Sequence, residues 1–167
     1  MTKFLRAGVT AVALAASMAC SSSTTSPSQV NSTSSGQASF SVGVRPSPIT
    51  ATRCSPQCSG ESGTSYAFSV VMTIDVQNAT GVGATVNSIT LTATADTTTF
   101  APLTFSSDDI RRQAGATHVD ERATLSIPLT VVYNTPSGRA NLSVSVSVQI
   151  TDDRNNQVTA TGQTSVL

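Results

Sequence analysis

The sequence contains few of the residues on which catalytic sites and nucleic-acid-binding surfaces usually depend. It has no tryptophan, a single histidine (His118) and a single lysine (Lys3), and only 11% of its 167 residues are charged. Nucleic-acid binding calls for a basic patch, often with aromatic residues that stack on bases, and the sequence offers neither. We therefore exclude nucleic acid as a partner. One imidazole also cannot form a zinc site without cysteine or carboxylate ligands from elsewhere in the chain.

The sequence also lacks a hydrophobic run of the roughly 20 residues that a membrane-spanning helix needs. Its N-terminus has the parts of a secretory signal instead. Lys3 and Arg6 supply positive charge, residues 7–16 (AGVTAVALAA) form a short apolar segment, and small residues crowd the positions before Cys20. We predict that residues 1–19 are a signal peptide that is cleaved off.

The residues around Cys20 resemble the signal of a bacterial lipoprotein, in which a cysteine becomes the lipid-modified first residue of the mature chain. Ser17, Met18 and Ala19 precede Cys20, and Ser17 stands where the usual pattern has leucine. The resemblance implies diacylglycerol on Cys20 and a lipid-anchored place in the bacterial cell envelope, and Ser21 after the cysteine implies the outer membrane. Because the same three residues suit ordinary signal peptidase, a soluble periplasmic or secreted chain that begins at Cys20 is the alternative.

The number of cysteines agrees with a lipid on Cys20. Three cysteines in an exported protein leave one thiol unpaired, whereas lipid on Cys20 leaves Cys54 and Cys58 as a pair. These two lie in RCSPQCSG with Pro56 between them, and in an oxidising compartment we predict a local disulfide across a turn. No further Cys or His lies nearby to complete a zinc site, and the spacing is not the CxxC of redox proteins.

The segment that follows Cys20 is too polar to fold. Residues 21–37 (SSSTTSPSQVNSTSSGQ) cannot bury enough apolar surface to offset the entropy of ordering. We predict a flexible tether over residues 20–37, with an r.m.s. reach of roughly 20–25 Å. Loss of residues 1–19 removes Lys3 and Arg6, so Lys and Arg fall from 9 to 7 against 9 Asp and Glu, and the mature net charge is near −2.

From residue 38 onward, apolar residues alternate with serine, threonine and other polar residues, as in strands that have one face on a core. No window shows a helical period. Turn-forming segments at 78–83, 134–138 and 152–156 predict hairpins, and Pro128, which cannot donate to a ladder, predicts an edge strand or a bulge. The predicted strands are 40–44, 48–52, 66–76, 86–95, 100–105, 123–133, 142–150 and 158–166.

Seven or eight antiparallel strands in about 130 residues predict an all-β fold, with a single two-sheet sandwich over residues 38–167. The strand rhythm and the closing stretch LSVSVSVQITDDRNNQVTATG resemble the immunoglobulin-like or fibronectin-like sandwich of bacterial surface lipoproteins. The chain departs from an antibody domain, since it has no tryptophan and no cysteine pair placed to join two sheets. The resemblance implies a domain that binds or spaces other molecules, without catalysis and without a cofactor.

Two groups of residues carry chemistry worth testing against this expectation. His118 is near Asp120 and Glu121 in the sequence, and a histidine with nearby carboxylates can act as a general base. No GxSxG-like nucleophile motif accompanies it. Asp152 and Asp153 offer oxygen ligands of the kind that calcium takes. Their spacing fits no EF-hand loop, and tight turns also favour aspartate, so we predict no metal, with these two residues as weak calcium candidates.

The function that we expect is a non-catalytic, membrane-anchored sandwich that contacts an envelope protein, a glycan or the cell wall. Two alternatives remain. One is an envelope enzyme or enzyme accessory with a site near His118 and Asp120, and the other is a secreted, soluble binding domain.

Overall fold

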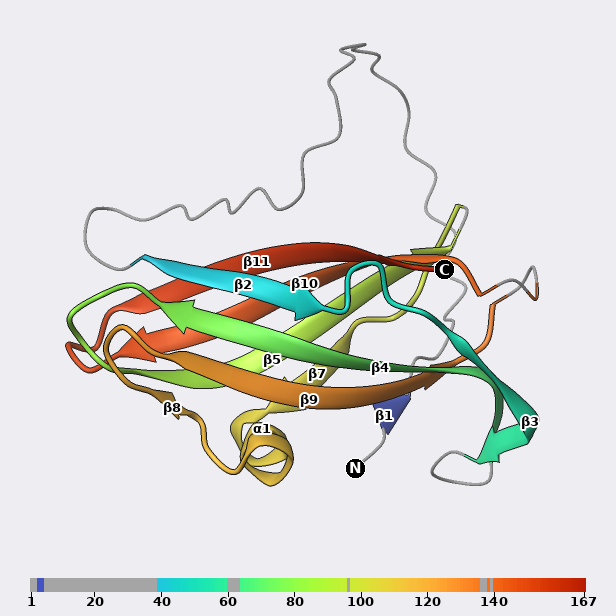
Figure 1. Cartoon of the computed structure of the whole chain (residues 1–167), viewed down its shortest axis with the longest axis horizontal. Helices are drawn as coiled ribbons and strands as arrows, with labels where there is room; N and C mark the ends of the chain where they lie inside the picture. The colour runs from blue at the N-terminus through green and yellow to red at the C-terminus, as the bar shows by residue number, and fades with distance from the viewer. Residues whose placement is uncertain (1–2, 5–38, 60–63, 96, 136–137, 139) are drawn as a thin grey trace, which may run out of the picture.

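The computed structural model describes residues 3–4, 39–59, 64–95, 97–135, 138 and 140–167. These residues form two sheets packed face to face and one short helix, so the predicted all-β sandwich is confirmed (Figure 1). The first sheet contains β1 (Lys3–Phe4), β9 (Thr124–Tyr133), β4 (Ser65–Asn78) and β2 (Phe40–Arg45) in this order, and β3 (Thr52–Ser59) also pairs with β4. The second contains β11 (Gln157–Val166), β10 (Leu142–Asp152) and β5 (Ala84–Ala95), whose other edge carries β6 (Thr98–Thr99), β7 (Leu103–Ser106) and β8 (His118–Val119).

The described residues form eleven strands, more than the seven or eight predicted; eight of them have four residues or more, and β1, β6 and β8 have two residues each. The bounds predicted for the second strand, 48–52, are wrong. Pro46 and Pro48 cannot donate to a ladder, and Ile49 forms only an isolated bridge to Val166. The strand runs instead over Thr52–Ser59, so it contains both cysteines, which we had expected in a turn.

Two of the three predicted hairpins are also wrong. Residues 152–156 do join the paired strands β10 and β11. Residues 78–83, however, lead from β4 in the first sheet to β5 in the second, and the segment after β9 likewise leads across to β10. Turn-forming residues favour a change of chain direction, but the same residue types occur in hairpins and in connections between two sheets, so they do not distinguish the two. The predicted edge position of Pro128 is confirmed, because β9 pairs with β4 alone at that residue.

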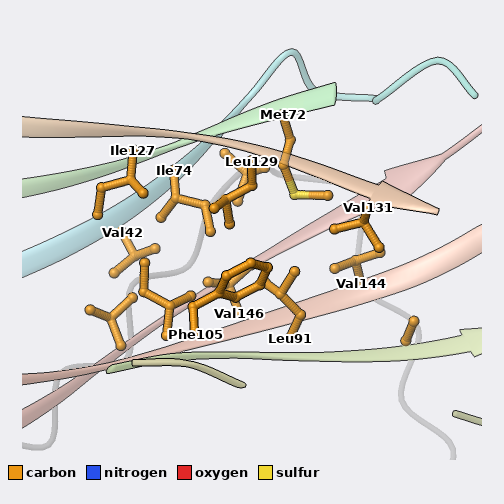
Figure 2. Packing of buried hydrophobic residues seen from close by; sticks show 14 of the residues in the cluster. Val42, Met72, Ile74, Leu91, Phe105, Ile127, Leu129, Val131, Val144 and Val146 are labelled. Carbon is orange, nitrogen blue, oxygen red and sulfur yellow. The ribbon is translucent and has the colours of Figure 1, made fainter. Parts of the chain in front are cut away.

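The core consists of the inward-facing residues of both sheets, which alternate with polar residues along each strand. Met72, Ile74 and Leu129 of the first sheet face Leu91 and other apolar residues of the second (Figure 2). The largest fully buried side chains are Tyr133, Phe40, Phe100, Phe105, Ile49, Ile74, Ile89, Leu91, Ile110, Ile127, Leu129 and Ile150.

One side of the sandwich is closed by contacts between β2 and β11, the edge strands of the two sheets. A Cβ atom built on Gly162 would lie only 2.8 Å from the carbonyl oxygen of Val42, so the strands approach each other as closely as a glycine allows. Next to this contact, the backbone N–H of Ile49 donates to the carbonyl of Ser165 at 2.8 Å, and the N–H of Leu167 donates to the carbonyl of Ile49 at 2.9 Å.

The opposite side is covered by helix α1 (Ser107–Ala114), which packs against β7 and β9. The sequence did not predict this helix, because Ile110 is its only buried apolar residue and one residue gives no period. Its caps did carry a signal. Ser106 and Asp109 form a capping box, and Gly115, at φ 79°, adopts the left-handed conformation that favours glycine at a helix end.

Candidate functional site

The candidate residues lie at opposite ends of the sandwich. At one end, Phe40 begins β2 and pairs with Asn78, close to the connections 78–83, 118–123 and 152–156. At the other end, β3 and the start of β4 extend beyond the core, near the end of β9 (Figure 1). We call these the Phe40 end and the disulfide end.

The Phe40 end brings His118 between two carboxylates that lie far apart in the sequence. The Nε2 atom of His118 is 3.5 Å from Oδ1 of Asp120, and its Nδ1 atom is 4.0 Å from Oδ1 of Asp153. The group surrounds Gly83, where a Cβ atom would lie 2.5 Å from Oδ2 of Asp153 and 2.7 Å from Nε2 of His118. The predicted neighbours His118 and Asp120 thus meet one of the two calcium candidates.

This group is open to solvent. The side chains of His118, Asp120 and Asp153 are 46%, 85% and 51% exposed. Beneath them, buried Asn78 donates from Nδ2 to the carbonyls of Val82 and Asp120, at 2.7 and 3.0 Å, and thereby fixes the connection between β4 and β5. The arrangement is that of a hydrogen-bonded set of loops with an imidazole on its surface.

Asp152, the other calcium candidate, organises the turn between β10 and β11. Its Oδ1 atom accepts hydrogen bonds from the backbone N–H groups of Arg154 and Asn156, at 3.0 and 2.7 Å, and its Oδ2 atom accepts one from Nδ2 of Asn156 at 2.9 Å. These bonds hold the pKa of Asp152 below its usual range. Among the described residues, no group of three or more His, Cys, Asp or Glu side chains is arranged to hold a metal ion.

At the disulfide end, Cys54 and Cys58 are joined as the sequence predicted, with 5.3 Å between their Cα atoms. Both lie in β3, where the register with β4 shifts between Arg53, opposite Phe68, and Cys58, opposite Tyr66. Several residues of β3 therefore bulge out opposite a single residue of β4, and the disulfide closes this bulge.

Aromatic side chains attach the disulfide end to the core. The ring of Phe68 stacks on that of Tyr133, with 5.5 Å between centroids, and the guanidinium of Arg53 lies 5.7 Å from the centre of Phe68. The hydroxyl of Tyr133 donates to the carbonyl of Ala140 at 2.7 Å, and burial raises the pKa of Tyr133 to about 12. Asn134 accepts from the N–H of Ala67 at 2.7 Å.

Sequence reasoning missed an ion pair on the outer face of the first sheet. Arg45 of β2 binds both carboxylate oxygens of Asp75 in β4, and Ser126 of β9 donates to Oδ1 of Asp75 at 2.6 Å. Asp75 is only 7% exposed, and the hydrogen bonds from Arg45 hold its pKa below the usual range. These residues are at least 30 positions apart along the chain, so no local pattern announces the group.

A small cavity lies between the sheets, lined by apolar residues that include Met72, Tyr133 and Val144. Its volume of about 10 Å³ is no more than one water molecule needs, and its lining offers no polar partner for a water. We interpret it as a packing gap in the core.

Two sequence predictions fall elsewhere. Cys20 and the predicted tether lie outside the described residues. The described part of the chain includes no helix that is both long and apolar enough to cross a membrane.

Comparison with known proteins gives information on the fold and none on the function. No protein-family model matches the chain, and no curated protein matches it. Among solved structures, the chain is similar to the X-ray structure of a structural genomics target, SoR45 of the Northeast Structural Genomics Consortium. The TM-score is 0.54 and the identity 11%, over 76% of this chain and 85% of that one. Similarity at this identity indicates a shared architecture, and function has to be argued from the residues.

Proposed function

We propose that the protein is a bacterial envelope lipoprotein, held in the membrane by lipid on Cys20, whose sandwich binds or spaces an envelope partner without catalysing a reaction. The pairing of Cys54 with Cys58 carries this proposal, because it leaves Cys20 as the third cysteine, directly after a signal-like segment. A lipid thioether uses this thiol, whereas a soluble chain would expose it in an oxidising compartment.

The position of β2 shows at which end of the sandwich the proposed tether joins the domain. The tether of residues 20–37 joins the domain just before Phe40, so it leads into the Phe40 end. The disulfide end, with β3 and the end of β9, lies at the other end of the sandwich from this point and is open to a protein or glycan of the envelope.

The shape of the disulfide end supports a role in contact with a partner. The residues of β3 are exposed or half-buried throughout, yet the disulfide, the stacked pair of Phe68 and Tyr133 and the Arg53 contact hold this extension in place. A pre-organised surface loses less conformational entropy on binding than a mobile one.

The test is the intact mass of the mature protein from a membrane fraction, before and after reduction. We expect a chain that begins at Cys20 and carries diacylglycerol, with a further gain of about two daltons on reduction of the disulfide. The variant Cys20→Ser should leave the membrane fraction. A matched double variant, Cys54→Ser with Cys58→Ser, also removes cysteines, here those of the disulfide, and should stay there. A wild-type chain without lipid in the soluble fraction would refute the anchor.

A further inference from the structure

Exposed strand edges are the places where a sandwich can add a strand from another protein, and most edges of this domain are protected. The edges of β2 and β11 face each other across the Gly162 contact. The far edge of the second sheet consists of the short strands β6, β7 and β8 beside α1. The edge of β3 is interrupted by its bulge and by Pro56.

The remaining edge, that of β9, is protected over part of its length. The N–H of Asn78 in β4 donates to the carbonyl of Ala123, just before β9. Because backbone groups alternate in direction along a strand, residues 125, 127, 129 and 131 point their N–H and C=O groups toward β4. Residues 124, 126, 128, 130 and 132 point theirs away from it. Pro128 is in the second set, so it removes one outward donor from this edge.

Beyond Pro128, the backbone groups that point away from β4 belong to Thr130 and Val132. At these residues β1 is added to the edge of the sheet. β1 pairs in parallel with β9, Lys3 opposite Val131 and Phe4 opposite Val132. In a parallel ladder, a residue opposite Val131 bonds to the carbonyl of Thr130 and the N–H of Val132. These two groups point away from β4, so they are free to pair with β1 as the observed register requires.

The side chains next to this stretch are apolar on the outer face, where most residues are polar. Val132 points outward, since it is outside the core cluster, yet it is only 3% exposed. Val71 lies diagonally across from it on β4 and is 63% exposed, one of two large hydrophobic residues exposed in the described part of the chain. An added strand with an apolar side chain opposite Val132 would pack against this valine, whereas Val71 remains exposed with β1 in place.

We propose that the β9 edge from Thr130 to Val132 is a strand-addition site, which β1 occupies in the uncleaved chain and which removal of residues 1–19 opens to a partner protein. The occupant is an extended segment of that partner, parallel to β9, with an apolar residue beside Val132. This inference rests on the proposed cleavage of the signal, because β1 lies within residues 1–19.

The experiment uses residues 20–167 with Cys20→Ser, which retains every residue of the core cluster. The probe is a synthetic peptide of residues 1–8, MTKFLRAG, as a stand-in for the partner segment. Amide hydrogen exchange and chemical shifts are followed by NMR. We expect the N–H of Val132 to exchange at least about tenfold faster than those of Leu129 and Val131, which face β4, and to become protected as peptide is added.

Proline variants separate edge pairing from any other binding. Val132→Pro removes the outward N–H that the peptide needs, and should weaken its binding about tenfold or more. Thr124→Pro is the matched control, since it removes an outward N–H at the start of the same strand, away from the residues that pair with β1, and should leave binding unchanged. Val132→Thr keeps the N–H but removes apolar contact, and should weaken binding several-fold.

Three results would overturn the proposal. The first is a Val132 amide that is protected in the 20–167 chain without peptide at every protein concentration. The second is equal loss of peptide binding in Val132→Pro and Thr124→Pro. The third is protection that grows with protein concentration, which would assign the edge to a second copy of the chain. None of them depends on lipid at Cys20, so failure here is distinct from failure of the anchor.

Discussion

The closure of the sandwich on its β2–β11 side can be tested by adding a single methyl group. In Gly162→Ala the new Cβ atom would lie 2.8 Å from the carbonyl oxygen of Val42 and 3.2 Å from its Cγ1 atom. The first contact is with the backbone, so no rotamer change relieves it, and one of the two strands must move. No positive φ requires glycine at this position, so the expected cost is steric.

Overpacking of this kind costs about 1–3 kcal/mol. Replacing glycine with alanine also removes freedom from the unfolded chain, which stabilises the folded state by about 0.4–1 kcal/mol. We therefore expect Gly162→Ala to lower the free energy of unfolding by about 1–2 kcal/mol. Gly43→Ala is the matched control, because its Cβ atom would come no closer than 3.9 Å to Asp75. It should be neutral or slightly stabilising.

Urea denaturation followed by far-UV circular dichroism measures both variants, since the chain has no tryptophan for fluorescence. The two unfolding curves should share one slope and differ in midpoint, with Gly162→Ala unfolding at the lower urea concentration. If Gly162→Ala proves as stable as Gly43→Ala, β2 and β11 are not in contact as described, and this side of the sandwich is open.

Three further substitutions test other parts of the fold. Asp75→Asn should lower the free energy of unfolding by about 1–2 kcal/mol at pH 7, because it weakens charged hydrogen bonds whose partner Arg45 is largely exposed. Folding lowers the pKa of Asp75 from 3.8, so the stability that its carboxylate contributes is present above that pH and is lost as the pH falls through the folded pKa. Urea titrations at pH 7 and pH 3 should therefore show a smaller difference between Asp75→Asn and wild type at pH 3. Equal losses at the two pH values would contradict the assignment. Cys54→Ser with Cys58→Ser should cost about 2 kcal/mol or less, because the closed ring is small, and should speed hydrogen exchange in β3 alone. Ile110→Ala should cost about 2–4 kcal/mol in the same urea assay and expose the amides of α1, which has no other buried apolar side chain; a loss below 1 kcal/mol would mean that the helix is held by its caps instead.

The strands could be predicted because their cause is local. An alternating residue pattern has one face that must be buried, whatever strand lies next to it. This explains why the strands at 66–76, 86–95, 142–150 and 158–166 lie within or close to the observed β4, β5, β10 and β11. The disulfide could be predicted from the number of cysteines, because lipid on Cys20 would leave Cys54 and Cys58 as the remaining pair.

What the sequence did not reveal depends on contacts between distant segments. The same turn residues form the hairpin at 152–156 and the passage between sheets at 78–83, because a turn does not encode which sheet the next strand joins. The meeting of His118 with Asp153 and the pair of Arg45 with Asp75 both follow from strand register, which no local window contains.

The proposed lipid anchor and the proposed strand-addition site occupy compatible positions on the domain, although they rest on different residues. The anchor leads into Phe40, which pairs with Asn78, whereas Val132 pairs with Ser69, nine residues nearer the start of β4. At roughly 3.3 Å per residue, the strand-addition site stands about 30 Å from the point where the tether joins the domain. A tether with an r.m.s. reach of roughly 20–25 Å adds to this distance, so a site on the β9 edge would be presented to partners well beyond the lipid headgroups.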